Sequence, residues 1–173
     1  MEVRIRPWDE GDAEALAAAV AASLPELRPW MPWAADEPQP PDARRAWIRE
    51  ANAAEAAGGD RTRAILAGGA VAGSCGLHRR IGPDALELGY WVATALTGRG
   101  VATAAVALLA AEAFADSAIG HVEIHHDPRN AASGAVAARA GFTPVAPVAT
   151  AGAAPERIWR LTRAGWDALT AGR

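Results

Sequence analysis

The sequence predicts a mixed α/β (α+β) fold in a single domain, residues 1–173, with a mixed, mostly antiparallel sheet of six to seven strands and about four flanking helices. Three observations predict it. Short apolar runs alternate like half-buried strands, alanine-rich segments of helical length separate some of them, and glycine or proline marks the turns. A chain of 173 residues is also long enough to bury a core.

The first third of the chain reads as one strand and two helices. Residues 3–7 alternate like a strand, and Asp9 or Asp12 can cap the alanine-rich helix that follows. Residues 24–33 are punctuated by prolines and contain two tryptophans, and 36–41 form a proline-rich loop.

A second helix should begin at a cap formed by Asp42 and run to about Ala57, where Gly58 and Gly59 end it. The middle of the chain then reads as an antiparallel meander. Its expected strands are 62–66, 70–79 and 86–92, with a hairpin turn at 68–69 and a turn at 81–84.

A helix should run from about 98 to 115, with Val101, Leu108 and Leu109 among its buried positions. It leads into a strand at 121–126, so the strands on either side of this crossover should be parallel. The expected remaining elements are a helix at 131–140, strands at 143–148 and 157–161, and a short helix capped by Thr162.

Composition excludes several functional classes. The net charge is −3, which gives no electrostatic case for nucleic-acid binding. No apolar run is long enough for a membrane span, and the N-terminus does not resemble a signal peptide. One cysteine, Cys75, excludes an internal disulfide and favours a reducing cytoplasm.

A glycine-rich turn between a strand and a helix is the most informative stretch. Residues 87–92 end a strand, and 96–103 open into a helix through Gly98 and Gly100. Glycine lets backbone amides approach a ligand, and a helix N-terminus favours an anion. With the cation of Arg99, this turn predicts a pyrophosphate site, although a plain strand–helix connection is the alternative.

Asn130 and Ser133 form the second feature. Asn130 precedes a helix and Ser133 falls in its first turn, so simple capping explains both when they are taken alone. Their position after the strand at 121–126 also places both polar groups at the mouth of the expected site.

Together, the Gly-Arg-Gly-Val-Ala-Thr turn at 98–103, Val-Glu-Ile at 122–124 and Asn-x-x-Ser…Gly-Phe at 130–142 resemble the GCN5-related N-acetyltransferase (GNAT) superfamily. Within it, the chain is similar to the RimJ/RimL-like ribosomal-protein N-terminal acetyltransferases. Leu-Arg-Pro-Trp-Met-Pro-Trp at 27–33, Glu-Leu-Gly-Tyr-Trp-Val at 87–92 and Trp-Arg-Leu-Thr at 159–162 carry that resemblance.

The resemblance implies acetyl-CoA as co-substrate, no metal, and a fourth and fifth strand that splay apart to admit the acetyl group. The residues implied in cofactor binding are Trp91 and Val92 for the pantetheine arm, Thr97, Gly98, Arg99, Gly100, Val101, Ala102 and Thr103 for the pyrophosphate, and Asn130 and Ser133 near the pantetheine and sulfur.

Two positions depart from the family pattern. Thr97 stands where Gln or Arg is usual, which predicts weaker but not abolished binding. The tyrosine that many relatives use to protonate the leaving thiolate corresponds to Ala137, and the one tyrosine of this chain is Tyr90. Members of the RimJ/RimL branch use the serine at the Ser133 position instead, so the resemblance implies Ser133 as the acid.

The implied reaction is direct attack of a neutral amine on the thioester, so a base must take the amine's proton. Glu123 and Glu87 are the candidates, and bulk water is the third alternative. The Val92 amide is the expected oxyanion donor. We expect Cys75 to be a buried, inert thiol. His121 and His125 lie about 13 Å apart along a strand, which argues against a shared metal ion.

Trp30, Trp33 and Trp47 either fill the core or line the acceptor site. The expected acceptor is a protein or peptide N-terminal α-amine, with a small-molecule amine as the rival and a non-catalytic CoA sensor as the alternative of another class. The acidic pair Asp36–Glu37 hints at a cationic acceptor. The sequence is compatible with a monomer or a homodimer.

Overall fold

Seven strands form one mixed sheet in the computed structural model, which describes residues 1–146 and 155–172. Their spatial order is β1-β2-β3-β4-β5-β7-β6, and every neighbouring pair is antiparallel except β4–β5. The strands are β1 (Val3–Pro7), β2 (Arg61–Ala67), β3 (Ala70–His78), β4 (Ala85–Val92), β5 (His121–His126), β6 (Thr143–Val145) and β7 (Arg157–Thr162). The expected meander and parallel crossover pair are confirmed.

The described chain contains six α-helices rather than about four. They are α1 (Ala13–Ala21), α2 (Leu24–Leu27), α3 (Pro41–Ala56), α4 (Val101–Phe114), α5 (Ala131–Arg139) and α6 (Arg163–Ala171), with 3-10 turns η1 (Glu10–Asp12), η2 (Pro32–Asp36) and η3 (Thr94–Leu96). The proline-punctuated stretch supplies α2 and η2, because each tolerates a proline in its first turn.

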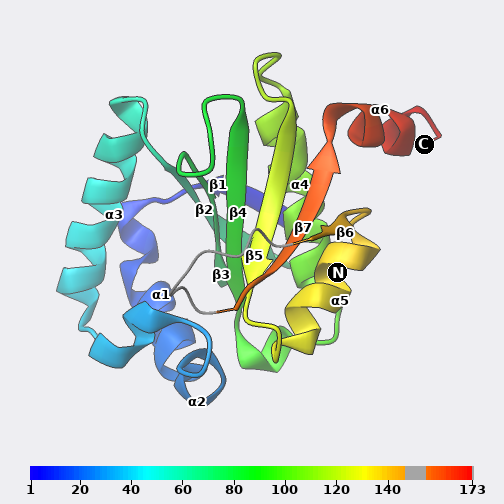
Figure 1. Ribbon diagram of the computed structural model, residues 1–173. Coiled ribbons are helices and arrows are strands. Elements are labelled where there is room, and N and C mark those ends of the chain that lie inside the picture. Colours follow the sequence, from blue (N-terminus) through cyan, green and yellow to red (C-terminus); the bar gives the residue numbers. More distant parts are fainter. Residues whose placement is uncertain (147–154, 173) are drawn as a thin grey trace.

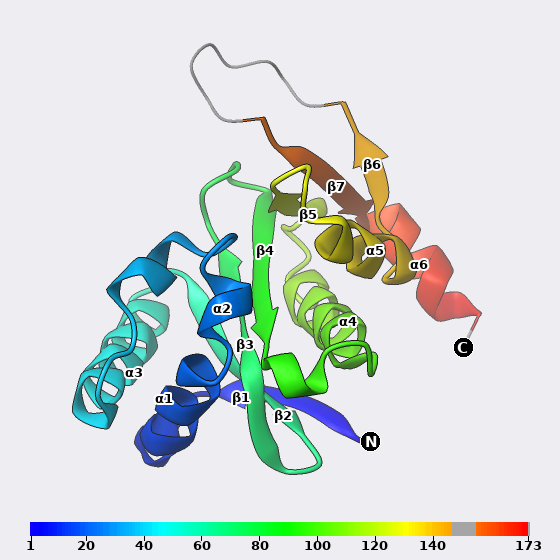
Figure 2. The same cartoon turned by 90° about the horizontal axis from the view of Figure 1, so that it is seen from below.

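The helices cover the sheet in two layers. Figure 2 shows α1, α2 and α3 on one side of β4 and α4, α5 and α6 on the other. The core under α4 includes Leu86, Leu88 and Val122, whereas Trp91 belongs to the smaller core under α1 and α3. Because side chains alternate along a strand, consecutive residues of β4 address different layers.

Several helix starts differ from the expected ones. Asp9 caps η1 and Asp12 precedes α1 without a side-chain cap, while α3 begins at Pro41, so that Asp42 lies inside its first turn. Helix α4 begins at Val101 rather than near residue 98, since Gly98 and Gly100 have positive φ angles. Thr162 caps α6 as expected.

Two smaller differences concern burial and strand ends. Leu108 is exposed, because Val101, Ala105 and Leu109 form the buried row of α4. Strand β3 ends at His78 rather than at residue 79. Strand β6 was expected to reach residue 148, but residues 147 and 148 lie outside the described residues.

Across residues 1–146 and 155–172, no helix has the length and apolar character needed to cross a bilayer.

Candidate active site

The parallel strands β4 and β5 separate after three register pairs. Ala85 pairs with His121, Leu86 with Val122 and Glu87 with Glu123, and the pairing ends there. Strand β4 continues along β3 to Val92, while β5 continues along β7 to His126. Each strand therefore follows its other neighbour, and a gap opens between the two. The expected splay is confirmed (Figure 1).

The end of β4 presents backbone groups to this gap. The Ala93 amide donates to the Ala72 carbonyl of β3 at 2.8 Å. Because amides alternate in direction along a strand, the Val92 amide points to the opposite edge, which is the gap. Strand β3 lies close against this segment, since a Cβ at Gly73 would clash with the Trp91 carbonyl oxygen. The Val92 amide is thus fixed where an added ligand can meet it.

The turn from η3 into α4 forms an open cradle of backbone amides. Gly98 and Gly100 have φ angles of +72° and +79°, and a Cβ built on either would meet nothing within 4 Å. Gly100 is the N-cap of α4 and provides no side-chain cap, so the first-turn amides at Val101, Ala102 and Thr103 stay available. With exposed Arg99 beside it, this turn suits an anion.

Thr97 has a local role in this turn. Its hydroxyl donates to the Thr94 carbonyl at 2.8 Å, which closes the preceding turn. The side chain that departs from the family pattern is therefore engaged with its own backbone, while the glycine cradle beside it remains open.

Helix α5 places Ser133 against a tyrosine. The Asn130 side-chain oxygen accepts from the Ser133 amide at 3.1 Å, which caps the helix and leaves the Asn130 amide group free to donate elsewhere. The Tyr90 hydroxyl, from β4, lies 2.9 Å from Ser133 Oγ and 3.3 Å from the Ser133 carbonyl oxygen. Burial raises the pKa of Tyr90 even though the Ser133 hydrogen bond opposes it. Sequence reasoning missed this contact.

Glu123 lies on the face of β5 opposite that of Val122 and Ile124, beside Arg160 and two histidines. Its Oε1 accepts from Arg160 Nε at 2.8 Å, and its Oε2 is 2.7 Å from His125 Nε2. Burial acts to raise the pKa of Glu123, but hydrogen bonds from His125 and Arg160 hold it below its ordinary value. His121 Nε2 lies 3.5 Å from Oε1, so His121 and His125 converge on one carboxylate despite their separation along the strand.

Glu87, the register partner of Glu123, is also buried and ion-paired. The guanidinium of Arg80 donates to both of its carboxylate oxygens, with Nε at 2.7 Å from Oε2. This interaction raises the pKa of Arg80. The two candidate proton acceptors therefore lie side by side where the gap begins, and each is hydrogen-bonded to an arginine.

The three candidate acceptor-site tryptophans are not equivalent. Trp30 and Trp33 are 37% and 38% exposed, and the Trp33 ring lies 6.0 Å from that of Trp91 at the end of β4. Trp47 instead packs edge-to-face on Trp8 at 5.9 Å, against the core under α1 and α3. Trp33 therefore lies beside the end of β4 at the gap, whereas Trp47 packs against the core under α1 and α3.

Glu37 and Cys75 are both buried within the fold. Glu37 is buried, is ion-paired with Arg44, and accepts from the Gln39 amide at 2.7 Å, so it does not offer the charge that the Asp36–Glu37 pair suggested. Cys75 is buried in β3, and burial raises its pKa to about 12. The expectation of a buried thiol is confirmed.

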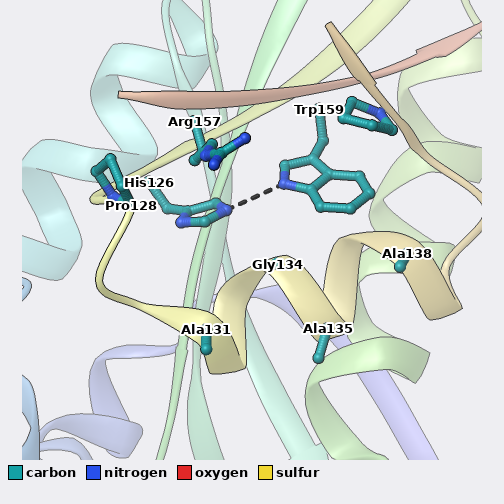
Figure 3. Close-up of a pocket in the computed structure, with 9 residues that line it drawn as sticks. His126, Pro128, Ala131, Gly134, Ala135, Ala138, Arg157 and Trp159 are labelled. Carbon is teal, nitrogen blue, oxygen red and sulfur yellow. Dashed lines mark hydrogen bonds between the residues drawn. The ribbon is translucent and has the colours of Figure 1, made fainter. Parts of the chain in front are cut away.

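Two surface pockets flank α5. Figure 3 shows one of about 350 Å³ between α5 and the strands β5 and β7, where Trp159 Nε1 donates to His126 Nε2 at 3.0 Å. It contains neither Tyr90 nor Ser133, so it lies apart from the gap. The other, of about 430 Å³, runs from Gly100 past Arg139 to Trp166 and thus continues from the cradle.

Comparison with known proteins agrees with this architecture. The family model described as an acetyltransferase (GNAT) domain matches residues 2–143. YdaF of Bacillus subtilis (strain 168), which carries the provisional name of a ribosomal N-acetyltransferase, is 32% identical over 150 residues, covering 81% of this chain and 77% of YdaF.

Two solved structures share the fold over nearly the whole chain. RimJ of Mycobacterium smegmatis, in complex with a CoA disulfide, is 25% identical with a TM-score of 0.78, covering 99% of this chain and 90% of RimJ. The Microcin C7 self-immunity acetyltransferase MccE, in complex with acetyl-CoA and AMP, is 19% identical with a TM-score of 0.82, covering 93% of this chain and 92% of MccE.

Proposed function

Because this chain belongs to the GNAT acetyltransferase family, we propose that it transfers the acetyl group of acetyl-CoA to the N-terminal α-amine of a peptide or protein. The observation that carries the proposal is the gap beyond the Glu87–Glu123 pair, with the amide cradle of α4 beside it. A strand edge with free amides and a helix N-terminus suit the amide-rich arm and the pyrophosphate of one ligand.

The residues around the gap fit acetyl-CoA. The turn 97–103 would hold the pyrophosphate through its amides, assisted by Arg99. The edge of β4 at Trp91 and Val92 and the side-chain amide of Asn130 would bind the pantetheine arm. The groove lined by Gly100, Arg139 and Trp166 would take the adenosine end, because it begins at the cradle.

The proposed acid and the proposed base lie on opposite faces of the sheet at this gap. Tyr90 packs toward the core under α4 and meets Ser133, whereas Glu123 is on the alternate face with His125 and Arg160. The amine would attack from the Glu123 face, and the sulfur would leave on the Ser133 face. The Val92 amide would stabilise the oxyanion, since it is directed into the gap.

We assign the proton acceptor to Glu123 together with His125, rather than to Glu87. Arg160 keeps Glu123 ionised, so this carboxylate alone is a weak base. Through its hydrogen bond with His125 it can instead hold the imidazole in one orientation. In other catalytic sites a carboxylate orients the imidazole that takes the proton. Glu87 is held by Arg80 and would keep the neighbouring strand in place.

A peptide acceptor is favoured by the position of this face beside α1, α2 and α3. Figure 1 shows these helices to the left of β4, with β5 and β7 toward the viewer and α4 behind the sheet. Exposed Trp30 and Trp33 would form one wall for an extended chain. The name of YdaF supports the same acceptor class. The MccE structure holds AMP beside acetyl-CoA, so a small-molecule amine is the second candidate.

The test is acetylation of peptides that carry both a free N-terminus and one lysine. We expect thiol release from acetyl-CoA and a single added acetyl group on the α-amine, located by fragment mass spectrometry. The same peptides with a formylated N-terminus should be inert. Acetylation of aminoglycosides or polyamines, with no reaction of any peptide, would instead favour the small-molecule acceptor. Tight CoA binding without transfer to any amine would contradict the enzymatic proposal.

A further inference from the structure

Tyr90 connects the strand that borders the gap to the helix that carries Ser133. Its hydroxyl lies 2.9 Å from Ser133 Oγ, across 43 residues of sequence, while its ring packs against the core under α4. The shorter of its two contacts is with the hydroxyl rather than with the Ser133 carbonyl at 3.3 Å. When the phenol donates to Ser133 Oγ, the serine proton is free to point into the gap.

A serine hydroxyl needs such a partner if it is to protonate a thiolate. An alkyl thiol has a pKa of about 8.5 and a tyrosine phenol about 10, whereas serine does not titrate in the range where proteins operate. A serine that gives up its proton must therefore receive another in the same event. The phenol is the group whose acidity lies nearest to that of the leaving thiol.

We propose that Tyr90 is the positioning residue and proton source for the leaving sulfur, and that it acts through Ser133. This inference rests on the proposed acetyl transfer. As the carbon–sulfur bond breaks, its electron pair stays on sulfur, which takes the Ser133 proton, and Ser133 Oγ takes the Tyr90 proton. Tyr90 is left as phenolate and regains a proton from water when the product thiol leaves.

The surroundings keep the phenol protonated before the reaction. Burial raises the pKa of Tyr90, and Arg139 on α5 opposes that rise. Burial raises the pKa of Cys75, its register partner on β3, to about 12, so this thiol adds no charge beside the phenol at neutral pH. Tyr90 is thus protonated at neutral pH and lies next to the Ser133 hydroxyl, to which it must give its proton.

The first test compares Tyr90→Phe, Ser133→Ala and the double variant. We expect each single change to lower kcat about 10- to 100-fold, with the CoA dissociation constant and the KM for acetyl-CoA nearly unchanged. The double variant should be no slower than Ser133→Ala within about threefold, because Tyr90 acts only through Ser133. Unchanged kcat in Tyr90→Phe, or losses that multiply in the double variant, would overturn the proposal.

The second test needs no turnover. Tyr90 is the only tyrosine, so the ultraviolet absorbance of tyrosinate titrates this one residue. We expect a midpoint above 10 that rises further in Ser133→Ala, because the hydroxyl stabilises the phenolate. An identical midpoint in both proteins would refute the coupling. If no amine is acetylated, the proposed function fails, while this titration still decides whether Tyr90 and Ser133 share a proton.

Discussion

Glu87 on β4 and Glu123 on β5 are register partners in the last pair before the two strands diverge. Opposed carboxylates on one face of a sheet repel each other. Arg80 and Arg160 offset this repulsion, each with bonds to one carboxylate. The two sides then differ in chemistry, because Glu123 also contacts His125 while Glu87 contacts the arginine alone among its side-chain partners in the described chain.

Glu123→Gln should lower kcat about tenfold or more, whereas Glu87→Gln should stay within about threefold of the parent protein. The amide keeps the size of the side chain but no longer orients His125 with a charge. The measurement is kcat across pH for both variants, with thermal unfolding as a check on folding. A larger loss in Glu87→Gln would transfer the role of base to Glu87.

Gly100→Asp should weaken CoA binding about 100-fold or more, because a carboxylate about 4 Å from the pyrophosphate costs about 4 kcal/mol at an effective dielectric constant of 20. Gly58→Asp is the matched control. Gly58 has a φ of +82° against +79° for Gly100, and a Cβ on either meets nothing within 4 Å. Both variants carry similar strain, so equal CoA affinity in calorimetry would refute the cradle.

Trp33→Ala should raise the KM for the peptide acceptor several-fold while leaving CoA affinity and stability almost unchanged. Trp33 is 38% exposed and lies beside Trp91 at the gap. Trp47→Ala should instead lower the free energy of unfolding by about 2 kcal/mol, because its ring packs on Trp8. Kinetics and chemical denaturation of both variants would separate the two roles. A stability loss in Trp33→Ala equal to that in Trp47→Ala would contradict this division.

The free energy of unfolding should decrease as the pH is lowered below about 4.5. Hydrogen bonds from Arg63 hold the pKa of Glu55 below its ordinary value of 4.5, so this pair stabilises the fold above the unfolded pKa and is lost as pH falls through the folded one. Glu55→Gln should cost about 1–2 kcal/mol at pH 7 and flatten the acid limb. Glu50→Gln, at an exposed site on the same helix, is the control. Equal acid limbs in all three proteins would contradict the assignment.

The order of the elements and the cradle could be predicted from the sequence because both depend on local signals. Alternation marked the strands, and Gly98 and Gly100 marked the turn before α4. The resemblance to the GNAT family, with the splayed strands that it implied, is confirmed. The predicted number of helices was too low, because proline also begins short helices such as α2.

The contacts within the site could not be predicted in the same way. Tyr90 meets Ser133 across 43 residues and Arg160 meets Glu123 across 37, so each contact depends on how α5 and β7 settle on the sheet. Alternation alone places Tyr90 on the face opposite Glu87, which was the available signal. A tryptophan on a surface helix can turn toward the core or the solvent, so Trp47 and Trp33 were indistinguishable before their neighbours were known.

We propose that the gap between β4 and β5 and the cradle of α4 together bind one molecule of acetyl-CoA. Calorimetric titration of the purified protein with acetyl-CoA tests it most directly. We expect one site per chain with a micromolar dissociation constant. No detectable binding up to millimolar concentration would contradict it, because the open amide cradle would then hold no pyrophosphate.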